Sequence, residues 1–206
     1  MTIWDRIEAA RARCNVLEHP FYVRWSEGEL TREELAEYSG QYRHATEAIA
    51  RLSEQVAEAA PEAERGGLRR HAAEEADHVE LWDGFVEAIG GDTAAPANAE
   101  TRECVEAWTA DDGLLPSLVR LYAIESGQPA ISQTKREGLA EHYGVGDGAG
   151  NVYFRVHERL DVEHAKAGRE LIERQMAGAD EDALVRAAES ALGANWRLLD
   201  GVGASG

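Results

Sequence analysis

The sequence contains little cysteine, little lysine and no long apolar run, and each shortage excludes a class of protein. Its two cysteines, Cys14 and Cys104, are too few and too far apart for a disulfide framework or a Cys-x-x-Cys metal site. Both are expected to be ordinary buried thiols in a reducing compartment. No stretch approaches the roughly 18 apolar residues of a membrane span, and no apolar leader segment opens the chain. We therefore predict a cytoplasmic protein without a membrane segment.

Basic residues are also scarce. The chain has 21 lysine and arginine residues against 39 aspartate and glutamate residues, for a formal net charge of -18. This charge repels nucleic-acid phosphates and anionic membranes, and no cluster of basic residues offers a local exception. Nucleic acid is therefore excluded as a predicted partner. Only two of the basic residues are lysines, Lys135 and Lys166, so a lysine at a functional position stands out.

Aromatic residues make up only 7% of the chain, whereas alanine, glutamate and leucine are abundant. No segment shows the alternation of a strand, and this composition favours an all-α protein. With 206 residues the chain can bury one substantial core. We predict a single domain over residues 1–200 and a flexible, glycine-containing tail over residues 201–206.

Glycine and proline divide the chain into about seven predicted helices. Thr31-x-x-Glu34 is a capping box that opens one of them, and Pro61 closes it. The segment HYGVGDGAGN lacks the preceding strand and the Gly-Lys-Ser/Thr ending of a phosphate loop, so it is predicted to be a flexible connection. The expected helices cover residues 2–16, 31–60, 64–89, 101–109, 114–141, 151 onwards and about 180 onwards, with an extended entry at His19-Pro20 into a short aromatic segment, 21–25.

The segment HERLDVEH places three polar residues on one side of a predicted helix. His157, Asp161 and His164 fall within about 60° of one another when successive residues are about 100° apart. They border the apolar stripe that contains Tyr153, and Gly168 leaves space on the same arc. These side chains are therefore predicted to face the interior.

Two further helices direct polar residues inward. In the third predicted helix, His71, Glu74 and Glu75 share a face with His78 and with several apolar side chains. Glu125 lies in the middle of the apolar stripe of the helix that begins near residue 114. Three helices thus bring carboxylates or imidazoles to the core.

Several carboxylates buried together cost several kcal/mol per ion unless cations neutralise them. Few arginines share these faces, so a bound metal is the economical explanation. Imidazole and carboxylate ligands without thiolate favour iron or manganese over structural zinc. Glu75-x-x-His78 and Asp161-x-x-His164 also match the acid-x-x-His pairs of dinuclear centres in helix bundles. We predict an Fe/Fe or Fe/Mn centre that activates dioxygen with electrons from an external reductant.

The sequence resembles the haem-oxygenase-like dimetal oxidases, a branch of the TenA/PqqC superfamily. The segment HPFYVRWSEGELTREELAEYSGQYRH, residues 19–44, is similar to the entry motif of that superfamily. The resemblance covers nearly the whole chain and implies a seven-helix bundle. In the family's pattern an acid precedes the first histidine, and here the segment between the two is shorter, which leaves the first ligand open. The metal ligands that the resemblance implies are Glu74 or Glu75, His78, Glu125, His157, Asp161 and His164, with His71 as a further alternative for the first.

Within that branch the sequence is most similar to the CADD-like proteins, which are implicated in making para-aminobenzoate for folate. In those proteins a tyrosine of the enzyme itself is proposed to supply the aromatic ring and a lysine the amine. Tyr22 occupies the matching place in HPFY, and Lys135 follows Glu125 by ten residues, as the family's lysine follows its glutamate. The resemblance also implies a homodimer. Further candidate catalytic tyrosines are Tyr38, Tyr42 and Tyr153.

Other functions stay open from the sequence. The same centre would also suit an oxygenase that acts on an external lipid, amine or amino acid. A TenA-like thiamin-salvage hydrolase needs a nucleophilic cysteine, and neither Cys14 nor Cys104 has the expected context. A PqqC-like oxidase without a cofactor would leave the inward carboxylates unneutralised. A non-enzymatic regulatory protein is the remaining alternative, and the acidic composition argues against DNA contact.

Overall fold

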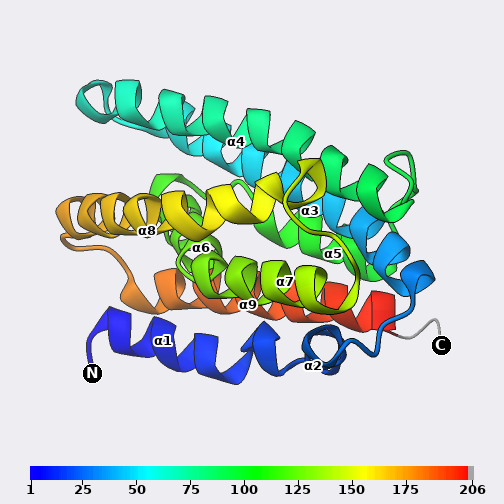
Figure 1. The fold of residues 1–206 in the computed structure, drawn as a ribbon. Coiled ribbons are helices and arrows are strands. Elements are labelled where there is room, and N and C mark those ends of the chain that lie inside the picture. The colour runs from blue at the N-terminus through cyan, green and yellow to red at the C-terminus, as the bar shows by residue number, and fades with distance from the viewer. Residues whose placement is uncertain (204–206) are drawn as a thin grey trace.

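The structure of the chain is a computed structural model that describes residues 1–203. Over these residues the protein consists of nine α-helices and one short 3-10 helix, without a strand (Figure 1). This confirms the predicted all-α fold. None of the described helices is long and apolar enough to cross a bilayer. The elements are α1 (Ile3–Arg13), η1 (Val16–Glu18), α2 (Pro20–Glu27), α3 (Arg32–Ala59), α4 (Glu62–Ile89), α5 (Ala99–Trp108), α6 (Leu114–Glu125), α7 (Gln128–His142), α8 (Ala149–Gln175) and α9 (Glu181–Gly203).

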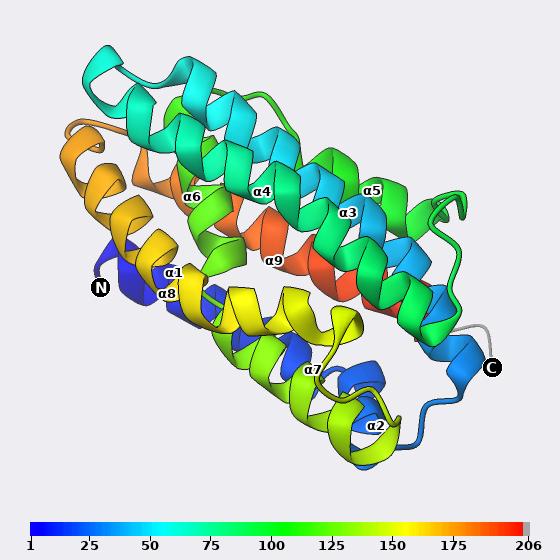
Figure 2. The same cartoon turned by 45° about the horizontal axis from the view of Figure 1, so that its top comes forward.

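Long helices packed side by side form the walls of the bundle. α3 and α4 lie against each other along their length, and α8 packs on α4, α6 and α7. α9 lies above α1 in the view of Figure 1, in contact with α1, α5 and α6. Figure 2 shows α7 between α8 and α2. The faces of α4, α6 and α8 that meet inside this arrangement carry the inward-pointing polar residues.

Local signals set both ends of α3 and the C-terminal end of α4 as predicted, whereas α4 starts at Glu62, two residues before the predicted residue 64. The Thr31 hydroxyl accepts a hydrogen bond from the Glu34 amide at 3.1 Å, and the Glu34 carboxylate accepts one from the Thr31 amide at 2.7 Å. α3 ends just before Pro61. α4 stops where Gly90 adopts φ 78°, a left-handed conformation that glycine reaches without steric cost.

The prediction of one helix over residues 114–141 is wrong, because this segment forms two helices. α6 ends at Glu125, and α7 begins at Gln128. Pro129 lies in the first turn of α7, where its missing N–H costs nothing. In a continuous helix the same proline would remove a hydrogen bond and collide with the Glu125 carbonyl. The chain breaks instead, directly after a candidate metal ligand.

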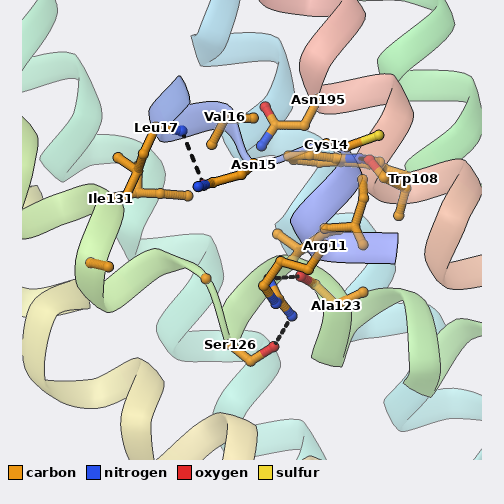
Figure 3. A pocket seen from close by; sticks show the side chains of 15 residues that line it. Arg11, Cys14, Asn15, Val16, Leu17, Trp108, Ala123, Ser126, Ile131 and Asn195 are labelled. Carbon is orange, nitrogen blue, oxygen red and sulfur yellow. Dashed lines mark hydrogen bonds between the residues drawn. The ribbon is translucent and has the colours of Figure 1, made fainter. Parts of the chain in front are cut away.

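Arg11, on the N-terminal helix α1, stabilises the chain at the break between α6 and α7. The Arg11 guanidinium donates hydrogen bonds to the Ala123 carbonyl at 3.1 Å and to the Ser126 hydroxyl at 2.5 Å (Figure 3). A cation that donates to the last carbonyls of a helix also offsets the negative end of the helix dipole. α1 therefore stabilises the end of α6 that carries Glu125.

Two smaller differences concern segment limits. The aromatic segment predicted at 21–25 belongs to α2, which starts after an extended His19 as expected. α9 continues through Gly203, past the predicted start of the tail at residue 201. Residues 204–206 of that predicted tail lie outside the described residues.

Candidate metal centre

α4 contributes three polar side chains to one interior face. His71, Glu75 and His78 are spaced by four and three residues, which places them on the same side of a helix. Glu75 is 4% exposed and His78 is 6% exposed, so both are inside the protein. His71 is slightly more open, at the edge of a pocket. α4 therefore brings two imidazoles and a carboxylate to the core.

α6 and α8 supply the facing side chains. Glu125 is the last residue of α6 and is buried. His157 and Asp161 are buried on α8, and His164 follows one turn later, half-buried. The predicted inward direction of all three helix faces matches these positions.

The first group of possible ligand atoms consists of the Glu75 carboxylate and the imidazoles of His78 and His157. The His78 Nδ1 lies 3.3 Å from the Glu75 Oε1, and the His157 Nε2 lies 3.9 Å from the Glu75 Oε2. The two imidazole rings are 4.4 Å apart between centroids. The His157 Nδ1 lies 2.9 Å from the Tyr153 carbonyl oxygen. Because a carbonyl oxygen can only accept a hydrogen bond, the Nδ1 carries a proton, and in the neutral imidazole the lone pair of the Nε2 is the one that is free for the group.

A second group shares Glu75 with the first. The His71 Nε2 lies 2.9 Å from the Glu125 Oε1 and 3.6 Å from the Glu75 Oε1. The His164 ring lies beside the His71 ring, with 4.0 Å between centroids and 39° between planes. In each group the possible ligand atoms lie within 4.8 Å of one another. Each group is compact enough to hold one metal ion, and the two groups share one carboxylate. This is the arrangement expected of a carboxylate-bridged dinuclear site.

Asp161 belongs to neither group but lies on the same face of α8. Its Oδ1 is 3.6 Å from the His164 Nδ1. Both of its oxygens are buried without a hydrogen-bond partner. The same holds for one atom on each of the six other residues, although several of these atoms lie at ion-pair distance. The buried atoms without a hydrogen bond in this cluster are the His71 Nε2, Glu75 Oε1, His78 Nδ1, Glu125 Oε1, His157 Nε2, Asp161 Oδ1 and Oδ2, and His164 Nδ1.

Such a concentration of unpaired polar atoms needs an explanation, because each buried and unsatisfied group costs about 1–3 kcal/mol. All of these residues except Asp161 belong to the two groups of possible ligand atoms, and a cation bound by each group would satisfy their atoms together. Imidazole and carboxylate are donors that iron and manganese accept. The residues present therefore fit a dinuclear iron-type centre.

The pKa values of the cluster reflect close packing of acids and imidazoles. Burial alone would raise the pKa of Glu75, but contacts with His157, His71 and His78 hold it well below its ordinary value. Burial would lower the pKa of His71, and the Glu125 and Glu75 carboxylates instead raise it to about 10. Burial raises the pKa of Glu125. In the absence of a metal, His71 therefore tends to keep a proton beside the two carboxylates, and metal binding there must displace it.

The alternatives for the first ligand differ in position. Glu75 is buried at the centre, and His71 is part of the second group. The Glu74 side chain is half exposed at the rim, where its Oε2 lies 3.3 Å from the His164 Nε2. The sequence predicts His71 only as an alternative for the first ligand. The signal that favours it is its spacing of four residues from Glu75 and seven from His78, two full turns of one helix face.

The candidate tyrosines and Lys135 form a separate buried compartment. The hydroxyls of Tyr22 and Tyr38 are 2.9 Å apart, and the Tyr42 hydroxyl accepts a hydrogen bond from the Gln128 amide at 3.1 Å. The Lys135 Nζ lies 4.5 Å from the centroid of Tyr42, 5.1 Å from Tyr22 and 5.3 Å from Tyr38. The predicted catalytic lysine is therefore enclosed by the predicted catalytic tyrosines.

Burial controls the protonation of this compartment. Lys135 is only 1% exposed, and burial lowers its pKa well below the ordinary value. Burial also raises the pKa values of Tyr22 and Tyr38 well above normal. The lysine therefore tends toward a neutral amine while the phenols keep their protons. A neutral amine has a free lone pair and can act as a nucleophile or a base.

Tyr153 connects the two regions. Its ring stacks on the His157 imidazole, with 3.9 Å between centroids and 24° between planes. It also meets the indole of Trp82 edge to face, with 4.8 Å between centroids. It is therefore placed between the metal cluster and the aromatic core.

A pocket of about 340 Å³ opens on the second group of the cluster. His71, Glu125 and His164 line it, and Leu118 and Leu171 form part of its apolar wall. Arginine and glutamate side chains line it as well. The pocket provides space for a small molecule beside the cluster, on the side of the His71 and His164 rings.

Gly168 on α8 lines this pocket, and a methyl group added there would meet nothing within 4 Å. Glycine inside a helix costs about 0.5–1 kcal/mol relative to alanine. Gly168→Ala is therefore expected to raise the free energy of unfolding by about this amount in urea denaturation. Gly150→Ala is the control and is expected to lower it, because the added methyl would collide with Ala88. A Gly168→Ala protein no more stable than wild type would contradict open space at this position.

Another pocket, of about 170 Å³, is lined by Arg11, Cys14, Trp108 and Asn195 (Figure 3). None of the residues of the metal cluster lines it. Cys14 is half-buried there, and Cys104 is fully buried with its thiol pKa raised by burial. Neither cysteine is placed as a nucleophile beside the cluster.

Comparisons with known proteins agree with this geometry. The sequence model of a family described as iron-containing redox enzymes matches residues 45–196. A 4-aminobenzoate synthase of Nitrosomonas europaea is 32% identical over 98% of this chain and 91% of its own length, and one of Chlamydia muridarum is 30% identical over 97% and 89%.

Solved structures show the same fold. A domain of unknown function with a heme oxygenase-like fold from Shewanella denitrificans matches with a TM-score of 0.81, at 18% identity, over 98% of this chain and 92% of its own. A TenA homologue from P. horikoshii matches with a TM-score of 0.75, at 15% identity, over 97% and 96%. With its family model, its relatives and its fold in agreement, this chain belongs to the haem-oxygenase-like family of iron-containing redox enzymes.

Proposed function

We propose that this enzyme is a dinuclear iron or iron-manganese oxidase that uses dioxygen and an external reductant to make 4-aminobenzoate from its own Tyr22 and Lys135. The observation that carries the proposal is the pairing of two buried sites in one core. One is the cluster with two possible metal groups that share Glu75, and the other is the enclosed lysine among tyrosines. The names of the relatives, 4-aminobenzoate synthase, support the product.

The proposed ligands of the first metal are Glu75, His78 and His157. The second metal would be held by Glu75, His71, Glu125 and His164. Asp161 could be a further ligand of either metal. When bound, the pair would supply the redox capacity to reduce dioxygen, which no side chain in the cluster has by itself. The imidazole and carboxylate donors suit iron and manganese alike, so the choice between them stays a proposal.

The chain's own residues would hold the reacting groups in place. The hydrogen bond between the Tyr22 and Tyr38 hydroxyls fixes the phenol ring, and the aromatic surroundings exclude water. Lys135 lies 5.1 Å from the Tyr22 ring centroid, so an amine and a phenol are neighbours before any reaction. Because burial disfavours the ammonium form, the nitrogen lone pair is available when the ring is oxidised.

The pocket beside His71 favours a second candidate, an oxygenase that acts on an external small molecule. The two candidates differ in stoichiometry, since self-sacrifice yields at most one product per chain. A TenA-like hydrolase has no support from the position of either cysteine. The homodimer and the cytoplasmic location stay predictions.

The test combines metal analysis with mass spectrometry. Protein produced with iron and manganese is expected to hold up to one metal per candidate group, and after reductant and oxygen to release 4-aminobenzoate with a mass change at Tyr22 and Lys135. Tyr22→Phe and Lys135→Arg are expected to keep the metal and lose the product. Repeated turnover of an added substrate, with an unchanged chain mass, would favour the second candidate. Protein that binds no metal under these conditions would contradict both.

A further inference from the structure

The proposed reacting ring and the metal cluster are not in contact. Over the described residues, the aromatic and cationic neighbours of Tyr22 are Phe21, Trp25, Tyr38 and Lys135, and none of them belongs to the cluster. Oxidation of Tyr22 by a centre at Glu75 therefore requires electrons to cross the core.

A continuous series of rings spans that distance. From the cluster outward, the His157 ring stacks on Tyr153 at 3.9 Å, and Tyr153 meets Trp82 at 4.8 Å. Trp82 meets Tyr42 at 4.9 Å, and Tyr42 meets Tyr38 at 5.4 Å. The hydroxyl of Tyr38 is 2.9 Å from that of Tyr22. Each of these side chains is at most 2% exposed, so water does not interrupt the series.

We propose that Tyr153 and Trp82 relay electrons from the tyrosines around Lys135 to the metal cluster. This inference rests on the proposed function. The oxidant is dioxygen, consumed at the cluster, and the electron donor is the phenol of Tyr22. Trp82 suits a relay because indole and phenol rings lose an electron far more readily than the phenyl rings of Phe85 and Phe154, which pack against it.

The relay balances in electrons and protons. Tyr38 would lose one electron through Trp82 and Tyr153 to the cluster and give its phenolic proton to the neutral Lys135 amine, whose Nζ lies 5.3 Å from the centroid of the Tyr38 ring. The Lys135 nitrogen must release this proton again before its lone pair can bond to the oxidised Tyr22 ring. A hydrogen atom then passes from the Tyr22 hydroxyl to the Tyr38 oxygen along their hydrogen bond. The O–H bond of Tyr38 is restored, and the O–H bond of Tyr22 is broken. The net change is the loss of one electron and one proton from Tyr22.

A second tryptophan provides a matched control. Trp82 and Trp108 are both fully buried, and each donates its indole N–H to a backbone carbonyl, of Ser39 at 2.8 Å and of Ala191 at 3.0 Å. Trp82→Phe and Trp108→Phe therefore remove the same group from similar surroundings, but only Trp82 lies in the series. Tyr153→Phe is the additional variant, because it removes an oxidisable phenol and leaves the ring to stack on His157.

Each variant would be loaded with metal, mixed with reductant and oxygen, and frozen at intervals. Metal content, the electron paramagnetic resonance signal of a tyrosyl radical, and the fraction of chains modified at Tyr22 would be measured. Trp82→Phe and Tyr153→Phe are expected to bind wild-type amounts of metal. In both variants the tyrosyl radical should form, and Tyr22 should be modified, at least about tenfold more slowly, equivalent to a barrier about 1.4 kcal/mol higher. Trp108→Phe is expected to match wild type.

Wild-type rates in Trp82→Phe and Tyr153→Phe would overturn the relay and leave the proposed function intact. Equal slowing in Trp108→Phe would also overturn it, since the effect would then come from a loosened core. A wild-type protein that binds metal and consumes oxygen without any change at Tyr22 would overturn the relay together with the self-sacrificing function.

Discussion

Glu75→Gln is expected to weaken iron binding at both groups of the cluster by more than about 100-fold, beyond the loss typical of residues that only support a ligand. Glu75 is the one residue common to the two groups, with one oxygen facing His78 and His71 and the other facing His157. Glutamine keeps the shape of the side chain but removes the charge and turns one oxygen into an N–H donor. Iron and manganese per chain, measured by elemental analysis after dialysis, would report the loss.

Glu74→Gln is the matched control for this variant. It makes the same chemical change one residue earlier on α4, at a side chain that is half exposed at the rim. Wild-type metal content is expected, since an exposed contact with His164 contributes little. If Glu74→Gln lost the metal and Glu75→Gln kept it, the assignment of the shared carboxylate would be wrong.

Lys135→Met is expected to raise the free energy of unfolding of the metal-free protein at pH 7 by about 1–3 kcal/mol, the cost of burying a polar group without full compensation. Lys135 is fully buried, and its amino group is surrounded by aromatic rings. Methionine fills a similar volume with no charge to desolvate. A stabilised protein that no longer forms product would show that the lysine is kept at a cost to the fold. Chemical denaturation would measure the change.

The difference in unfolding free energy between Lys135→Met and wild type is expected to depend on pH. In the folded state the pKa of Lys135 lies well below its ordinary value, so the unfolded chain binds more protons between the two pKa values. Wild-type stability therefore rises with pH across that window, at up to about 1.4 kcal/mol per pH unit from this one group. The advantage of Lys135→Met should shrink as the pH approaches the ordinary lysine value. Lys166→Met, at the exposed lysine, should show no such trend. A constant gap between Lys135→Met and wild type would contradict a depressed pKa.

Features with local causes could be predicted from the sequence. The capping box of Thr31 and the stop at Gly90 depend on residues a few positions apart, and both have the expected geometry. The inward direction of Glu125 and of the α8 triplet follows from helix periodicity and the apolar stripe. These contacts required no knowledge of the tertiary arrangement.

The remaining features depend on residues far apart in the sequence. The break after Glu125 is stabilised by Arg11 from α1, and because this contact is not visible in the local sequence, the sequence predicts one helix over residues 114–141. The choice between Glu74 and Glu75 is decided by how α6 and α8 pack on α4, because the two residues differ by only one step on the helix wheel. The enclosure of Lys135 by tyrosines from α2 and α3 likewise arises from packing.

The break between α6 and α7 separates two tasks that the sequence places close together. In one continuous helix, Lys135 would stand about 15 Å further along the axis than Glu125 and on a different face, at positions locked to each other by the helical rise. Because the chain breaks at Ser126 and Gly127, Lys135 and Glu125 belong to two helices, α7 and α6, whose directions are independent. The direction of α7 can therefore change during evolution, and bring a different side chain to the aromatic compartment, without moving Glu125.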